Sequence, residues 1–283
     1  MADQKNIDTL LESVVSLPSL PGIIARALAL LDDEDASLHD VGELLSTDPG
    51  TAARVLRMAN SATYGLRHKV TSVEHAVPML GASAVRNVCL SATVLEHLKR
   101  GARDFVRQSV SCGMLMEILT RNSTTVESSP DEAFIYGVLH KVGMLILLEH
   151  MPKECELSRS VARDRGIPLY MAEREVIQSD YAELGARLAQ HWELPDGIVG
   201  AIAGQHESAR CEDPRYQPMA ALLQVANAVC MAAGLTAEPE DTAVIEEAAW
   251  AKTGLTNALL VQAIEEFFQT LPSVDALVDD LFE

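Results

Sequence analysis

The chain has 283 residues, enough for one large core or two smaller ones. Apolar residues make up 48% and aromatic residues only 4%, and a set dominated by Ala, Leu and Val favours helices over sheets. The net charge of −19 argues against non-specific binding to nucleic acid or to an anionic membrane.

Residues 54–121 are an exception, because they carry ten basic and four acidic side chains. These bases either form a local positive face, which would allow nucleic-acid binding, or offset acids elsewhere in the fold; we expect the second. The sequence has no membrane-span pattern, no signal-peptide core and no paired cysteines. We therefore expect a cytoplasmic protein with reduced thiols, no membrane contact and no cofactor.

The first predicted elements are short amphipathic helices. Apolar residues three and four apart predict a helix over 7–15 and another over 23–31. Ser37 and Asp40 have the spacing of a capping box, which predicts the start of a third helix.

Asp48 and Pro49 match an N-cap followed by the proline that opens a helix. A further helix is predicted from Thr71 or Ser72 to Gly81, and a longer one over 83–98.

The second half repeats the pattern with longer elements. A helix is predicted over 104–121, and Ser129-Pro130 signals the start of another that carries apolar residues as far as Ile146. Further helices are predicted near 152–165, 168–177, 180–192, 195–204, 218–233, 241–252 and 256–270. We predict an all-α fold in which an N-terminal helical subdomain, 1–100, packs on a larger helical domain, 101–283.

Three stretches carry a family resemblance. They are a DPxxxxRVLRxAN-type helix from Asp48 to Asn60 with SVEHAVPMLG after it, then DEAFIYGVLHKVGMLILLEH, then AELGARLAQHWELP. In this order they resemble the HDOD family, the HD-related output domain of bacterial signalling proteins, from about Leu17 to about Gly234. The resemblance implies a helical fold related to the HD metal-dependent phosphohydrolases.

Those enzymes place a histidine, a His-Asp pair and a distal aspartate around divalent metal, which supplies a hydroxide nucleophile. By resemblance the first histidine falls on about Gln108, the pair on His140 and Lys141, and the aspartate on about Asn227. An ammonium offers no lone pair, and amides bring no negative charge. His206 is the other histidine that could serve as a ligand. We predict no bound metal and no catalytic residue, with Gln108, His140, Lys141, His206 and Asn227 as vestigial metal-site positions, the HD-equivalent positions.

Other residues give weaker signals. Arg54 and Arg57 lie three apart on one helix and could bind an anionic ligand or a partner carboxylate, although a solvated face explains them as well. Cys112 lies on the helix of Gln108, and we expect a buried structural thiol there.

We expect a non-catalytic regulatory module that contacts another signalling protein in trans. The first alternative is a module that binds a small anionic ligand or nucleotide in the former metal pocket, with Lys141 in place of the cation's charge. The candidate residues for binding a ligand or a partner are Arg54, Arg57, Lys141 and His206. A residual metal-dependent phosphohydrolase is the second alternative.

Overall fold

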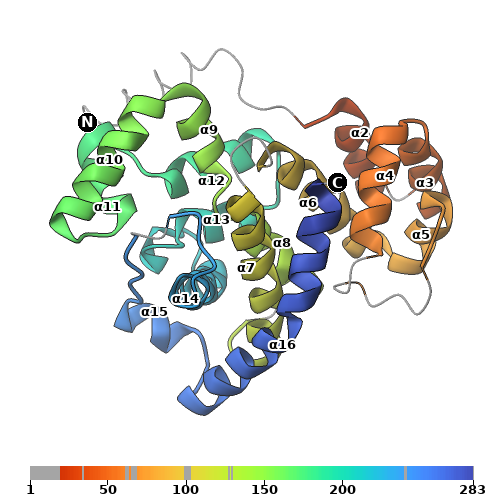
Figure 1. Ribbon diagram of the computed structural model, residues 1–283. Coiled ribbons are helices and arrows are strands. Elements are labelled where there is room, and N and C mark those ends of the chain that lie inside the picture. Colours follow the sequence, from red (N-terminus) through yellow and green to blue (C-terminus); the bar gives the residue numbers. More distant parts are fainter. Residues whose placement is uncertain are drawn as a thin grey trace.

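A computed structural model describes residues 20–33, 35–60, 64, 69–98, 103–126, 128, 130–238 and 241–282. These residues form helices and connecting loops, with no strand among them, which confirms the predicted all-α class (Figure 1). The α-helices are α2 (Gly22–Asp32), α3 (Leu38–Ser46), α4 (Pro49–Ala59), α5 (Val73–Leu80), α6 (Ala82–Leu98), α7 (Arg103–Asn122), α8 (Pro130–Leu139), α9 (Gly143–His150), α10 (Pro152–Arg165), α11 (Leu169–Ile177), α12 (Tyr181–His191), α13 (Asp196–Ala203), α14 (Gln217–Ala232), α15 (Glu247–Lys252) and α16 (Asn257–Phe282).

The helices α2–α5 form a small bundle at one end of the molecule (Figure 1). Their predicted caps are confirmed: Ser37 and Asp40 make both bonds of a capping box, and the Asp48 side chain accepts from the backbone N–H of Thr51. The next helix, α6, packs against α2, α4 and α5 and also against α8, so it joins the bundle to the rest of the molecule. The division at residue 100 stays a prediction.

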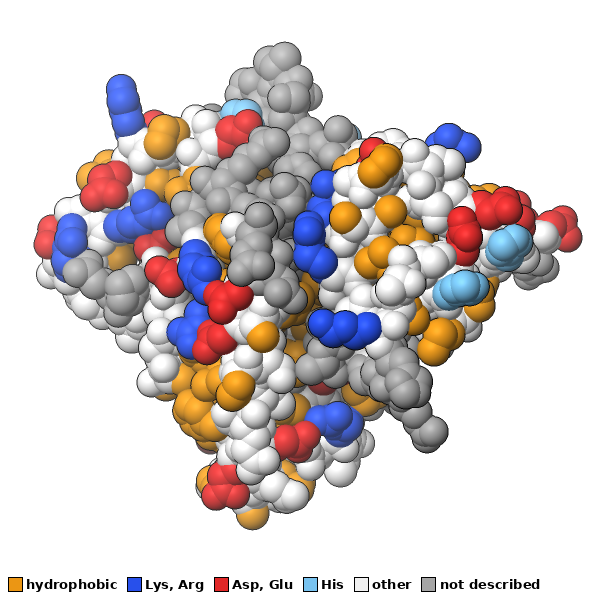
Figure 2. Space-filling view, turned by 45° about the vertical axis from the view of Figure 1, so that its right-hand side comes forward, with side chains coloured by type: hydrophobic (Ala, Val, Ile, Leu, Met, Phe, Trp, Pro, Cys, Tyr) orange, Lys and Arg blue, Asp and Glu red, His pale blue; other side chains and the backbone are white. Residues whose placement is uncertain are grey.

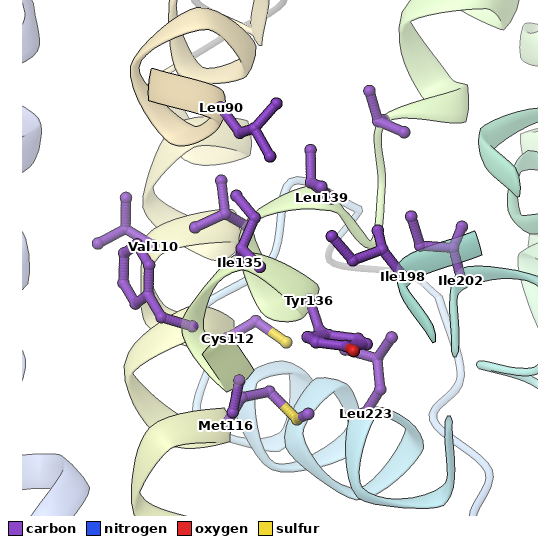
Figure 3. Close-up of a cluster of buried hydrophobic side chains, with 14 of the residues drawn as sticks. Leu90, Val110, Cys112, Met116, Ile135, Tyr136, Leu139, Ile198, Ile202 and Leu223 are labelled. Atoms are coloured by element: carbon purple, nitrogen blue, oxygen red, sulfur yellow. The ribbon is translucent and has the colours of Figure 1, made fainter. Parts of the chain in front are cut away.

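The larger part is built around α7, which is buried along most of its length against α8, α14 and α16. Glycine permits the closest of these contacts, because a Cβ at Gly137 would lie 2.4 Å from the backbone nitrogen of Gly113. One continuous set of buried apolar side chains runs from Ile24 to Val278, and Figure 3 shows part of it. The two parts therefore share a core.

Part of the basic stretch is paired with acids from elsewhere in the chain. Arg86 pairs with Asp32, Arg103 with Asp279, and Arg107 with Asp275 at 2.7 Å. Figure 2 shows Lys and Arg side chains beside Asp and Glu side chains on this face. For these three arginines, the expectation that the bases offset acids within the fold is correct.

The prediction of one continuous helix from Pro130 through Ile146 is wrong. It is divided into α8 and α9 by a turn at 140–142. The ring Nδ1 of His140 lies 2.6 Å from the carbonyl oxygen of Gly137, so a side chain competes for the acceptor that a continuous helix would give to residue 141. The span Glu132–His150 is long and apolar enough to cross a membrane, but 83% of it is buried within the protein.

Two other predicted boundaries differ from the structure. The helix predicted over 241–252 begins only at Glu247, because the preceding segment is bonded elsewhere: the Asp241 carboxylate accepts from the backbone of α11, and the backbone of Glu246 donates to a side chain of α14. The last helix continues to Phe282, past Pro272 and beyond the predicted end at 270, since its packing against α7 outweighs the proline. The helix predicted over 7–15 and the cap at Ser129 lie outside the described residues.

Candidate functional site

Three of the HD-equivalent positions meet in the interior, although they come from distant parts of the chain. Gln108 lies on α7, His140 in the turn after α8, and Asn227 on α14. The Gln108 Nε2 donates to Asn227 Oδ1 at 3.1 Å, and His140 Nε2 lies 3.3 Å from the same oxygen. Gln108 also accepts through Oε1 from the backbone N–H of Ala237 at 3.0 Å. Both the nitrogen and the oxygen of the Gln108 side-chain amide therefore form hydrogen bonds.

The His140 imidazole is held as a neutral ring. Its burial, and then the charge of Lys141, lower its pKa to about 3. Each ring nitrogen faces an oxygen acceptor, Nδ1 at 2.6 Å and Nε2 at 3.3 Å, and a neutral ring has a single proton. The shorter contact favours the proton on Nδ1, which leaves the lone pair on Nε2. The backbone carbonyl of His140 accepts from Gln205 Nε2 at 2.7 Å, which holds the turn against α13.

Lys141 points into the protein, with a side chain that is 1% exposed. Its Nζ lies 5.2 Å from the centre of the Tyr181 ring and has no hydrogen-bond partner among the residues that the structure describes. The charge of Lys141 interacts with the carboxyl groups of Glu173 and Asp241. Burial raises the pKa of both carboxyls, and Lys141 lowers it. The lysine thus brings a positive charge into a region that also holds acids.

His206 is part of an aromatic stack that leads outward from Lys141. Its ring is stacked on Tyr170 at 4.1 Å and meets Tyr181 edge-on at 4.9 Å. Arg174 covers the other face of Tyr170 at 4.7 Å and bonds to Asp180 at 2.6 Å. Burial, followed by the charges of Arg174 and Lys141, holds the pKa of His206 well below its usual range.

A small cavity of about 20 Å³ lies beside His206. Tyr170, Tyr181, Gln205, Asn227 and Asp241 are among its walls. The Tyr181 hydroxyl and Gln205 Oε1 are buried there, and neither has a hydrogen-bond partner in the described part of the chain. Because a water molecule needs at least about 10–15 Å³, the cavity admits one water and is too small for a nucleotide.

Residues 241–246 are neither helix nor strand, and Thr242, Ala243 and Val244 line the cavity. The Asp241 carboxylate accepts from the backbone N–H of Leu169 at 2.7 Å, and the N–H of Glu246 donates to Gln224 Oε1 at 3.0 Å. Hydrogen bonds to α11 and α14 therefore hold this segment at both ends.

The sequence of this chain is similar to one known protein family. A family model described as the HDOD domain matches residues 17–208, about two thirds of the chain. The chain belongs to the HDOD family. The matched region begins where the sequence motifs predicted and ends before the expected limit near Gly234.

Solved structures agree with this assignment at the level of the fold. An HDOD domain protein of unknown function from Geobacter sulfurreducens has 21% identity and a TM-score of 0.76, covering 96% of this chain and 97% of that chain. A candidate phosphohydrolase from Shewanella amazonensis SB2B has 27% identity and a TM-score of 0.73, with the same coverage. A candidate signal transduction protein from Marinobacter aquaeolei VT8 has 22% identity and a TM-score of 0.78, covering 100% of this chain and 66% of that chain.

Among curated proteins, an uncharacterised protein of Treponema pallidum (strain Nichols) is 23% identical over 219 residues. The match covers 76% of this chain and 42% of that protein, so the chain spans about two fifths of its relative's length.

The HD-equivalent positions of this HDOD chain do not fit a divalent cation. The amides of Gln108 and Asn227 bond to each other, and Lys141 adds a positive charge close by. Among the described residues, no group of three or more His, Cys, Asp or Glu side chains could hold a metal ion.

The structure does not bring the predicted arginines to this place. Arg54 and Arg57 lie on α4, which packs against α3, α5, α6 and α16. Arg54 bonds to the Thr51 hydroxyl at 3.1 Å, and the buried Nε of Arg57 has no partner. Cys112 is buried, and desolvation raises the pKa of its thiol well above the usual value, as expected for a structural cysteine.

Sequence reasoning missed four residues that shape the site: Glu173, Tyr181, Gln205 and Asp241. Gln205 directly precedes His206 after an apolar helix, and Glu173 lies among apolar residues on α11. Those were the available signals, but polar residues in such positions are usually exposed.

Proposed function

We propose that this HDOD protein is a non-catalytic regulatory module that acts through contacts with another signalling protein in trans. Its family assignment, together with the candidate signalling role of the Marinobacter protein, supports a role in signalling. The high negative charge argues against nucleic acid as the partner, and we propose a cytoplasmic location without membrane contact.

One observation carries the non-catalytic part of the proposal: the paired amides of Gln108 and Asn227 beside the buried ammonium of Lys141. A hydrolytic metal site needs three or four lone-pair donors, and carboxylates among them offset the charge of the cation. Here an ammonium and two amides stand at three of those positions. A metal would have to displace a hydrogen bond and lie close to a like charge.

Metal analysis and a phosphodiesterase assay test this directly. The purified protein, incubated with Mn²⁺, is dialysed and analysed for metal, and hydrolysis of bis(p-nitrophenyl) phosphate is followed. We expect neither bound metal nor turnover. The triple variant Gln108→His, Lys141→Asp, Asn227→Asp is the matched control, because it supplies the missing ligand types and should retain metal. Retention of Mn²⁺ with turnover by the wild-type protein would show that the phosphohydrolase alternative is correct.

The contact with a partner is tested in the native cell. Affinity capture of the tagged chain, followed by mass spectrometry, should recover another signalling protein at a reproducible stoichiometry. Recovery of nucleic acid in place of protein would contradict the proposal.

The small-ligand alternative has one supporting observation, since Lys141 points inward and its Nζ has no hydrogen-bond partner. Against it stand the buried carboxyls of Glu173 and Asp241 and the small size of the cavity. Titration with inorganic phosphate and with AMP, in the wild type and in Lys141→Met, separates the two functions. Binding that is lost in Lys141→Met would favour the ligand-binding module.

A further inference from the structure

A groove along α13 contains two adjoining cavities that share one wall, Tyr216. The first, about 290 Å³, lies between α6, α8 and α13, where the N-terminal bundle meets the larger part. The second, about 440 Å³, lies on the other side of Tyr216, between α13 and residues 210–213. Neither cavity includes an HD-equivalent position.

Glycines on α13 form this groove. A Cβ at Gly197 would lie 2.7 Å from the Tyr136 hydroxyl and 3.0 Å from the Tyr216 ring, and a Cβ at Gly200 would lie 2.8 Å from Cys211 Sγ. Gly197 therefore allows the half-buried Tyr216 to lie close to the helix, and Gly200 does the same for Cys211. The ring of Tyr216 then remains a partly exposed ridge between the two cavities.

The two cavities differ in chemistry. The first has apolar walls of Ile135, Tyr136 and Ile198, which belong to the buried cluster of Figure 3, and Pro195 adds an exposed apolar edge. The remaining wall is polar, with Arg86 and Glu132 as its charged residues. Such a cavity suits a single apolar or aromatic side chain, the usual anchor of a protein interface.

The second cavity is acidic. Asp196, Glu212 and Asp213 line it, together with Arg210. Arg210 already pairs with Glu207 at 2.6 Å, and Asp213 pairs with Arg215 at 2.6 Å. Asp196 and Glu212 are exposed, and neither forms an ion pair with another residue in the described part of the chain. The uncompensated charge of this cavity is therefore negative, and a Lys or Arg side chain complements it.

We propose that the α13 groove docks a segment of a partner protein in which an apolar or aromatic residue lies next to a lysine or arginine. This inference rests on the proposed role in protein contacts and names the surface and the chemistry of the partner. A second copy of this chain is disfavoured as the occupant, because each copy carries a net charge of −19, and a nucleic acid is disfavoured by the acids that line the groove.

A peptide selection tests the groove without requiring that the partner be identified first. The full chain is used to select binders from a phage-displayed library of random linear peptides. We expect enriched peptides that combine an apolar anchor with Lys or Arg and that bind more weakly as salt is raised. Failure to enrich any peptide, or enrichment of acidic peptides, would refute the proposal.

Variants assign the binding to the groove. Asp196→Lys/Glu212→Lys reverses two exposed charges and should weaken the selected peptides at least about tenfold. Glu247→Lys/Glu265→Lys is the matched control, because Glu247 is also an exposed acid in the first turn of a short helix and Glu265 is exposed on α16. Val199→Trp fills the second cavity without changing charge and should have the same effect as the double reversal. Equal affinity for all the variants would place the binding elsewhere.

Failure of the groove and failure of the proposed function are distinguishable. A partner from the native cell that binds the double charge reversal as tightly as the wild type would refute the groove alone. Metal-dependent turnover by the purified protein would refute the non-catalytic role while leaving the peptide data intact.

Discussion

Among the glycines that the structure describes, Gly143 is the one where a single added methyl group should destabilise the protein most. Gly143 begins α9, directly after the turn that holds His140 and Lys141. A Cβ at this position would lie 2.0 Å from the carbonyl oxygen of Tyr181 and 2.5 Å from the backbone nitrogen of Gly185. Both neighbours are main-chain atoms of α12, so no side-chain rotation can relieve the clash.

The size of the effect follows from that geometry. An ordinary contact with a Cβ exceeds 3.4 Å, so α9 and α12 must separate by more than 1 Å at this point. Overpacking costs about 1–3 kcal/mol where side chains can adjust, and we expect the upper end, about 3 kcal/mol or more, where only backbone can move. For a chain of this size that corresponds to a fall in Tm of about 6 °C.

Urea denaturation followed by circular dichroism measures the loss. Gly22→Ala is the matched control, because no heavy atom lies within 4 Å of its Cβ position, and it should be neutral or stabilising by up to about 1 kcal/mol. Equal stability of Gly143→Ala and the wild type would refute the close approach of α9 to α12 and, with it, the placement of Lys141.

Three further predictions concern individual bonds. Gln108→Ala should lower the free energy of unfolding by about 1–3 kcal/mol in urea titration, because the backbone N–H of Ala237 loses its acceptor; an unchanged midpoint would contradict that bond. In the ¹⁵N NMR spectrum of the folded protein, His140 should stay neutral with its proton on Nδ1 from pH 8 down to pH 5, since its pKa is about 3. In urea the same ring should titrate near about 6.5. A transition of the folded protein near neutral pH would show that the ring is in contact with solvent. Asp48→Ala should cost about 1 kcal/mol through the lost cap of α4, and thermal unfolding that matches the wild type would show that the cap contributes nothing.

Local sequence signals predicted the local structure well. The capping box at Ser37, the cap at Asp48 and the glycine after α5 each fix a helix end through neighbouring residues, and the structure has all three. The errors lie where distant residues intervene. The turn at His140 depends on its own ring and on Gln205, just after α13, and residues 241–246 are bonded to the backbone of α11 and to a side chain of α14.

The same distinction applies to the site. The resemblance identified Gln108, His140 and Asn227 as equivalent positions, and the fold brings them together. It could not show that Glu173 and Asp241 are buried near Lys141, because the burial of an acid depends on which helices cover it. The possible role of Arg54 and Arg57 in binding an anionic ligand or a partner stays a prediction, because spacing along one helix does not tell what that helix faces.

The bond from Gln108 to the backbone of Ala237 also bears on how reversible this scaffold is in evolution. A histidine at position 108 would provide a ligand nitrogen, yet it would leave a main-chain donor without its acceptor before any second ligand had appeared. The single change Gln108→His would therefore lower the free energy of unfolding by about 1–3 kcal/mol before any metal ligand set was complete. The contact with Ala237 thus favours glutamine at this position, whether or not the position has any part in metal binding.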